Sequence, residues 1–299
     1  SQGRDAYVMA SLLALDTRER VDTFVAALQV VVDRHDILRT AVLWEGLAAP
    51  MQVVCRHAPL VVEEIALDGQ QGDLADQLRA LHGPGRFLLD IRSAPLMRGF
   101  LVHDPRRGRW LMQILVHHLV CDHSTLELLI GEVQAILAGQ SAQLPRAWPF
   151  RDFVARLNRA NWEDDHRAFF IRMLADVETA SVPFGLLDVK GDGAGVAEAR
   201  LAIGLPLARR ARQQARKHGV SVASLMHLAW AQVLARLLGQ QDVVFGTVLL
   251  GRMQGQAGIE RMLGLFTNTL PVRITVGAGA VAQSLRDTHA LLSELLAHE

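Results

Sequence analysis

Residues 116–125 of the chain read VHHLVCDHST, so an apolar run ends here in paired histidines, an aspartate and polar residues typical of a helix start. Residues 110–116 before them are apolar and rich in branched side chains, and they are short enough for a strand buried on both faces. After them, Ser124 and Glu127 have the S-x-x-E spacing of a capping box, ahead of an apolar helical pattern that Gly139 ends. The sequence therefore predicts a strand, a turn and a helix N-terminus.

The two adjacent histidines of this stretch are not expected to serve the same site. Successive side chains of an extended segment point to opposite faces, so one of His117 and His118 is structural. The helix N-terminus downstream presents unpaired N–H groups and partial positive charge, which suit an oxyanion or a carbonyl under attack. A histidine beside such a terminus is a candidate general base.

Length and composition indicate a globular protein of two lobes. The chain has 299 residues, of which 50% are hydrophobic and 21% charged, enough to bury more than one core. The Gly-rich, polar stretch 188–197 is the best linker candidate, which divides the chain into an N-terminal lobe, 1–187, and a C-terminal lobe, 188–299. The 31 basic residues balance the 31 acidic ones, so no general attraction to nucleic acid or an anionic membrane is expected.

Cysteine content and hydropathy predict a cytoplasmic protein. Cys55 and Cys121 are too few for a secreted disulfide framework, and the N-terminal residues lack the pattern of a signal peptide. The longest uncharged stretch, 220–235, carries polar side chains and is too short to span a membrane.

Hydrophobic periodicity predicts a mixed α+β fold. The expected strands are 7–15, 40–44, 51–55, 61–67, 96–103, 110–116, 243–250 and part of 263–274. The expected helices lie around 24–32, 74–81, 124–137, 153–170, 207–218, 221–238 and 281–296. In helix 221–238 the apolar residues expected to form core are Met226, Trp230, Val233 and Leu237. The basic helix 207–218 is expected to present a solvated face.

Four segments in order resemble the condensation domain of nonribosomal peptide synthetases, over nearly the whole chain. Residues 34–40, RHDILRT, are similar to the family's R-H-E-x-L-R-T, and 116–125 to H-H-x-x-x-D-G-x-S. Residues 148–153, WPFRDF, are a looser version of an aromatic-x-D-aromatic segment, and 263–271, LGLFTNTLP, resemble I-G-x-F-V-N-T-L-P. An HHxxxD motif alone also occurs in chloramphenicol-acetyltransferase-like and other CoA-dependent acyltransferases, so the resemblance depends on all four.

The resemblance implies an α+β fold of two chloramphenicol-acetyltransferase-like lobes in a V, with the second lobe incomplete. Between the lobes would run a tunnel, reached from opposite sides by the phosphopantetheine arms of upstream and downstream peptidyl carrier proteins. An acceptor amine there attacks a donor acyl thioester, and an adenylation domain is an expected neighbour. No cofactor bound by the domain itself, no nucleic acid and no membrane is implied.

The resemblance also implies roles for individual residues. His118 matches the second, catalytic histidine. Asp122 matches an aspartate used structurally, in an ion pair with an arginine of the other lobe, and Arg252 is the candidate partner. His123 stands where the motif has glycine, and could narrow the acceptor side or donate a hydrogen bond. With His123, the tunnel-lining candidates are Ser124, Asn268 and Thr269.

Other chemistry at this stretch is less well supported. His117, His118, Asp122 and His123 are residue types that bind zinc, but the opposed faces of the histidine pair argue against a metal, and none is predicted. Cys121 is expected to be a packed thiol, because no separate base for it is visible.

Three functions remain open at this point. The leading one is amide-bond formation between carrier-bound thioesters. An alternative is a starter domain that N-acylates the first amino acid from fatty acyl-CoA. A further alternative is a non-catalytic domain that docks carrier proteins; His118 and Asp122 count against it, whereas His123 leaves it open.

Overall fold

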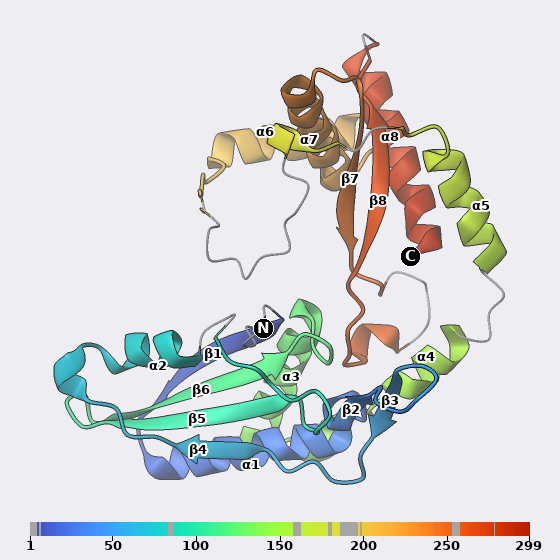
Figure 1. Cartoon of the computed structure of the whole chain (residues 1–299). Coiled ribbons are helices and arrows are strands. Elements are labelled where there is room, and N and C mark those ends of the chain that lie inside the picture. The colour runs from blue at the N-terminus through green and yellow to red at the C-terminus, as the bar shows by residue number, and fades with distance from the viewer. Residues whose placement is uncertain are drawn as a thin grey trace. The chain divides into compact units, whose positions relative to one another are not determined.

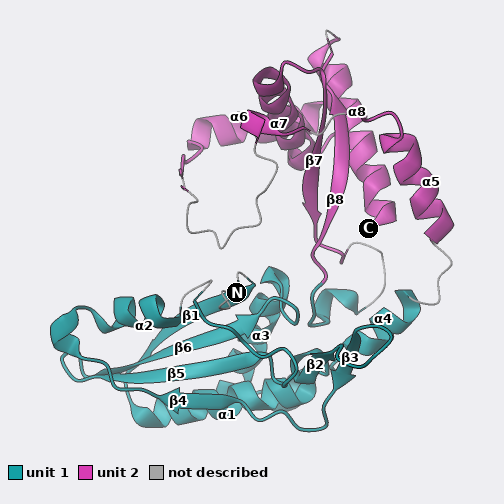
Figure 2. Ribbon diagram, in the orientation of Figure 1, with its two compact units in different colours: residues 1–159, 257–265 teal, residues 160–256, 266–299 magenta. Residues whose placement is uncertain are grey.

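The chain forms two compact units in the computed structural model (Figure 2). Unit 1 contains residues 1–159 and 257–265, and unit 2 contains 160–256 and 266–299. The predicted boundary at residues 187 and 188 lies outside the described residues and stays a prediction. The structure describes residues 5, 7–82, 86–157, 163–178, 181–185, 197, 199–252, 258–277 and 279–299.

Unit 1 is built on a four-stranded sheet with the order β1-β6-β5-β4 (Figure 1). Its strands are β1 (Val8–Leu15), β4 (Val61–Glu64), β5 (Met97–Asp104) and β6 (Arg109–His117). β6 pairs antiparallel with both β1 and β5, and β4 pairs parallel with β5. The middle position of β6 explains its continuous apolar run, because both of its edges are hydrogen-bonded and both faces are covered.

Helices cover both faces of this sheet. Leu74 and Leu78 of α2 (Leu74–His82) pack with Phe100, Leu111 and Leu115 on one face. The alternate strand residues, Ile114 and Val116 among them, face α1 (Arg18–Arg34) and α3 (His123–Leu137). Strand periodicity therefore sorts the side chains of β6 between two layers, and it places His117 on the same face as Leu115.

The rest of unit 1 agrees with the sequence patterns. The predicted hairpin is β2 (Thr40–Leu43) paired antiparallel with β3 (Met51–Val54). One difference is that the prediction of a single helix over 153–170 is wrong, because the structure has two helices there, α4 (Phe150–Leu157) in unit 1 and α5 (Glu163–Leu174) in unit 2. Trp162 and the linker candidate, apart from Ala197, lie outside the described residues.

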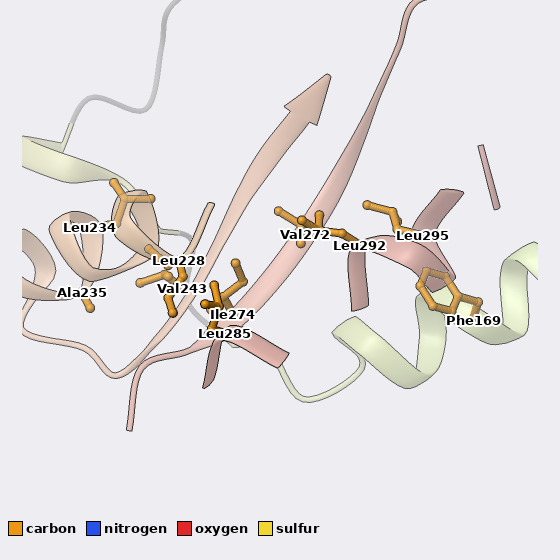
Figure 3. Packing of buried hydrophobic residues seen from close by; sticks show 11 residues of the cluster. Phe169, Leu228, Leu234, Ala235, Val243, Val272, Ile274, Leu285, Leu292 and Leu295 are labelled. Carbon is orange, nitrogen blue, oxygen red and sulfur yellow. The ribbon is translucent and has the colours of Figure 1, made fainter. Parts of the chain in front are cut away.

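Unit 2 packs helices onto an antiparallel strand pair, β7 (Asp242–Leu249) with β8 (Asn268–Thr275). Around this pair lie α5, α6 (Leu205–Lys217), α7 (Val222–Leu238) and α8 (Val281–Leu295). Figure 3 shows the core that joins the strand pair to α5, α7 and α8, formed by Phe169 of α5, Leu228, Leu234 and Ala235 of α7, Val243 of β7, Val272 and Ile274 of β8, and Leu285, Leu292 and Leu295 of α8.

The predicted core face of α7 is wrong. Met226, Trp230, Val233 and Leu237 are 41–51% exposed, whereas Leu228, Ala231 and Leu234, on the other side of the helix, are at most 4% exposed. The helix is apolar all round, so its periodicity could not choose between the faces. Ala231 is 0% exposed and lies in the core of unit 2 with Leu228 and Leu234, so tertiary packing selects that face.

No single helix in the described part of the chain is long and apolar enough to cross a membrane. Helices α6 and α7 meet the criteria of length and composition only when they are taken together, and they are bent by 107° at the break between them.

Candidate active site

The turn that carries the histidine pair is fixed by backbone hydrogen bonds at the end of β6. His117 N–H donates to the carbonyl of Leu96 (2.9 Å), and His118 N–H to the carbonyl of Tyr7 (2.7 Å). The chain then turns, with Val120 N–H donating to the carbonyl of His117 (3.1 Å), before α3 begins at His123. The position of His118 is therefore set by its neighbouring strands.

His117 is buried and bonded on both ring nitrogens. Leu119 N–H donates to its Nδ1 (3.0 Å), so Nε2 carries the proton of the neutral ring and faces the carboxylate of Asp5 at 3.0 Å. Burial lowers the pKa of His117, and the negative charge of Asp5 opposes that effect. Both nitrogens are used inside the protein, which leaves none for a substrate.

His118 has different surroundings. It is half-buried, and its imidazole makes no hydrogen bond with any residue that the structure describes. Of the two adjacent histidines, His118 is the one whose ring nitrogens are available to a bound molecule.

Asp122, and not Ser124, caps α3, so the predicted capping box is wrong. Asp122 Oδ1 accepts from Thr125 N–H (2.7 Å), its backbone φ is extended, and the helix begins one residue later than the cap, at His123. Aspartate is as good an N-cap residue as serine, and its negative charge interacts favourably with the positive N-terminal end of the helix dipole. Ser124 is half-buried in the first turn.

The Asp122 cap changes the predicted role of the helix N-terminus. A carboxylate of the chain itself accepts the Thr125 N–H, in place of a substrate oxyanion. The capping aspartate is 2% exposed, so its charge lies inside unit 1 beside the turn.

His123, at the position of the motif glycine, is the first residue of α3 and therefore has ordinary helical φ. The backbone here does not need the conformational freedom of glycine. The His123 side chain is 84% exposed, and its Nε2 lies 3.5 Å from Glu127 Oε1. Glu127 thus faces His123 and does not reach back to a cap.

Segments from four parts of the sequence meet beside this helix start within unit 1. Thr125 Oγ donates to the Gly264 carbonyl (2.6 Å) and accepts from the Gly264 N–H (3.0 Å). Gly264 lies against the ring of Phe150, where a Cβ would come within 2.2 Å of Phe150 Cδ2. The N–H groups of Phe150 and Arg151 donate to the two carboxylate oxygens of Asp36 (2.7 and 3.2 Å).

A second contact ties α3 to the end of α1. Glu132 Oε2 accepts from Arg34 Nε and pairs with His35 Nε2, both at 3.0 Å. Burial alone would raise the pKa of Glu132, but the hydrogen bonds from His35 and Arg34 lower it. Residues 34–36 therefore contact two helices: Arg34 and His35 contact α3, and Asp36 contacts α4.

The remaining candidates lie in unit 2. The guanidinium of Arg252 sits over the ring of Phe266, with Cζ 4.1 Å from the ring centroid. Asn268 and Thr269 are exposed at the start of β8. Asp122 belongs to unit 1, so its ion pair with Arg252 stays a prediction, as does the tunnel-lining role of Asn268 and Thr269.

Unit 1 also contains an apolar cavity of about 300 Å³ between its sheet and the helices α1 and α3. Ile114 and Val116 of β6 line it, together with Leu126 and Leu129 of α3. The cavity thus uses the strand and the helix that flank the His118 turn. Among the described residues, no group of three or more His, Cys, Asp or Glu side chains could hold a metal ion.

Comparison with known proteins assigns the chain to a family. The family model named Condensation domain matches residues 1–299. This chain is a member of the condensation-domain family. It is 46% identical over 295 residues to malpinin synthetase and 45% identical over 295 residues to malpibaldin synthetase, both of Mortierella alpina. Each match covers 99% of this chain but only 4% and 5% of the two synthetases.

The fold agrees with solved condensation domains. The structure of the first condensation domain of the CDA synthetase matches with a TM-score of 0.72 at 19% identity, over 99% of this chain and 70% of that one. The predicted nonribosomal peptide synthetase family and the mixed α+β, acetyltransferase-like fold are confirmed.

Sequence reasoning missed several residues of this site. Asp5 lies before the first predicted strand, and only the β1–β6 register brings it to His117. Thr125 was within the motif but carried no signal of its own, because its partner Gly264 is 139 residues away. Glu132 lies on the side of α3 that faces α1, and a charge inside an apolar helical pattern was the available signal.

Proposed function

We propose that this condensation domain forms an amide bond between a carrier-bound acyl or peptidyl thioester and a carrier-bound aminoacyl group. The observation that carries the proposal is the contrast between the histidines. His117 is committed to Asp5 and the backbone, whereas the ring of the half-buried His118 has no hydrogen bond to the described residues. A rigid turn that holds one available imidazole suits a base acting on a delivered amine.

In the proposed reaction the acceptor nitrogen attacks the donor carbonyl carbon. An imidazole nitrogen of His118 accepts the proton that the amine loses, the C–N bond forms and the C–S bond breaks. The phosphopantetheine sulfur leaves as a thiolate and takes up one proton. Delivery of both substrates on tethered arms would supply a large part of the rate through proximity.

The proposed partners are the two carrier proteins that present these substrates, with an adenylation domain nearby. The relatives are synthetases of which this chain spans a small part, and that supports partners on the same assembly. The phosphopantetheine is proposed as a group of the carriers, and not as a resident cofactor.

The first test of the mechanism is His118→Ala. Product formation from loaded donor and acceptor carriers should fall by about 10²–10⁴-fold, the range for loss of a general base. His57→Ala, which removes an exposed histidine of unit 1, is the matched control and should keep wild-type activity. Unchanged turnover in His118→Ala would reject the mechanism, whereas the expected loss of turnover would reject the non-catalytic docking alternative.

A second candidate, the starter domain, is favoured by the apolar cavity. Eleven of its thirteen lining residues are apolar, and the other two, Ser11 and Gln134, are uncharged. A cavity of about 300 Å³ with such walls suits the alkyl chain of a medium-chain acyl donor.

One competition experiment separates the two candidates. The chain receives an aminoacyl carrier acceptor together with an aminoacyl carrier thioester and octanoyl-CoA, and the products are read by mass spectrometry. A dipeptide supports the elongating domain, and an N-octanoyl amino acid supports the starter domain. Product absent with both donors, while carrier binding is retained, would contradict both.

A further inference from the structure

Thr125 joins the start of α3 to a distant segment through its side-chain hydroxyl, while its backbone N–H bonds to the helix cap. Its N–H donates to Asp122 (2.7 Å), and its hydroxyl both donates to and accepts from the backbone of Gly264 (2.6 and 3.0 Å). The residue is 0% exposed, so no water replaces these partners. A buried hydroxyl that is satisfied in both roles fixes the position of both segments.

The segment that Thr125 contacts is itself held tightly. The absence of a side chain at Gly264 allows the ring of Phe150 to pack against its backbone. Phe150 N–H is bonded to Asp36, which is 6% exposed. Thr125 is therefore connected through Gly264 and Phe150 to the end of α1, and the connection is made of buried groups throughout.

Thr125 is also bonded to the end of the turn that carries His118. Its N–H donates to the Asp122 carboxylate, and Asp122 is four residues after His118. The start of that turn is held by the bonds of His117 and His118 to Leu96 and Tyr7, the residues just before β5 and β1. The end of the turn leads into α3 through the Asp122 cap.

We propose that Thr125 is a positioning residue for His118. Its hydroxyl sets the distance between the turn that carries His118 and segment 258–265. The proposal rests on the proposed function of His118. It assigns to Thr125 a role in turnover beyond its contribution to folding, because a shift of the helix start would move the cap and the turn together.

The test compares Thr125→Val, which keeps the shape but removes the hydroxyl, with Thr125→Ser, which keeps the hydroxyl. Thr125→Val should lower kcat about 10- to 100-fold with the KM for the loaded carriers nearly unchanged, the size of effect expected from a misplaced catalytic group. Thr125→Ser should recover most of kcat.

The matched control is Thr288→Val in α8. Thr288 is 3% exposed and its hydroxyl donates to the Ser284 carbonyl (2.8 Å), so this variant also loses a buried threonine hydroxyl. It should lose thermal stability to a similar extent and keep kcat. If Thr125→Val keeps wild-type kcat, or if both variants lose activity in proportion to their stability, the positioning role is rejected.

A spectroscopic measurement separates this proposal from the proposed reaction. In spectra of the labelled chain, the Gly264 amide should be protected from hydrogen exchange in the wild type and in Thr125→Ser, and lose that protection in Thr125→Val. The His118 ring resonances should shift only in Thr125→Val. A wild-type chain without condensation activity would overturn the proposed function, whereas unmoved His118 resonances in Thr125→Val would overturn the positioning role.

Discussion

Two adjacent histidines have opposite environments because strand pairing ends between them. His117 is the last residue of β6 and keeps the alternating direction of its side chains, which places it in the interior beside Asp5. His118 is already in the turn, and its backbone N–H donates to Tyr7, the residue just before β1. The structural role of His117 and the proposed chemical role of His118 therefore differ because β6 ends between these two neighbouring residues.

Acid should destabilise the protein through His117. Burial lowers the pKa of this histidine, so the unfolded chain binds a proton that the folded chain resists. The free energy of unfolding should therefore decrease as the pH falls below about 6.5, the ordinary value for histidine, until the lowered pKa is passed. Urea unfolding of the wild type and of His117→Gln between pH 7.5 and 5 measures this directly.

The variant is informative because a second, half-buried histidine acts in the same direction. Burial also lowers the pKa of His82, whose ring stacks on Phe100 at 3.7 Å between centroids. His117→Gln keeps that contribution, so the difference between the two curves isolates His117. Parallel curves over this pH range would contradict the prediction.

At the scale of elements, the sequence predicted the types and places of helices and strands well, because each depends on local periodicity. It failed where two local patterns compete. Asp122 and Ser124 are both good caps, and the structure uses Asp122. Both faces of α7 are apolar, and tertiary packing selects the face that carries Ala231.

Two leucines of α7 test the corrected face. Leu234 is 4% exposed and packs in the core of unit 2, whereas Leu237 is 51% exposed. Leu234→Ala should lower the free energy of unfolding by about 2–5 kcal/mol. Leu237→Ala should change it by no more than about 0.5 kcal/mol, as surface substitutions do. Both are measured by urea unfolding, and equal losses would show that the face was wrongly assigned.

At the scale of the whole chain, the four motif segments could be recognised in the sequence, but their mutual contacts could not be predicted. Thr125 and Gly264 are 139 residues apart, and Asp36 and Phe150 are 114 apart. The hydrophobic periodicity of a single helix or strand contains no information about contacts between residues so far apart in the sequence. The segment 257–265 is the clearest case, because its neighbours in the sequence belong to unit 2 and its contacts belong to unit 1.

Gly264→Ala should therefore weaken unit 1, although the residue lies in the last sixth of the chain. Its new Cβ would come within 2.2 Å of Phe150 Cδ2, and relief of this overlap should cost about 1–3 kcal/mol, as overpacking of a core does. Hydrogen exchange followed by mass spectrometry should show faster exchange in α3 and α4 and unchanged exchange in β7 and β8.

The control for this variant is Gly131→Ala, because Gly131 is an exposed residue of α3 with open space around its added Cβ. It should stabilise the helix by about 0.5–1 kcal/mol, since alanine loses less backbone entropy than glycine on folding. The two substitutions are chemically identical and have opposite predicted signs. Faster exchange confined to β7 and β8 in Gly264→Ala would mean that segment 257–265 supports unit 2, and the proposed role of its contact with Thr125 would fail with it.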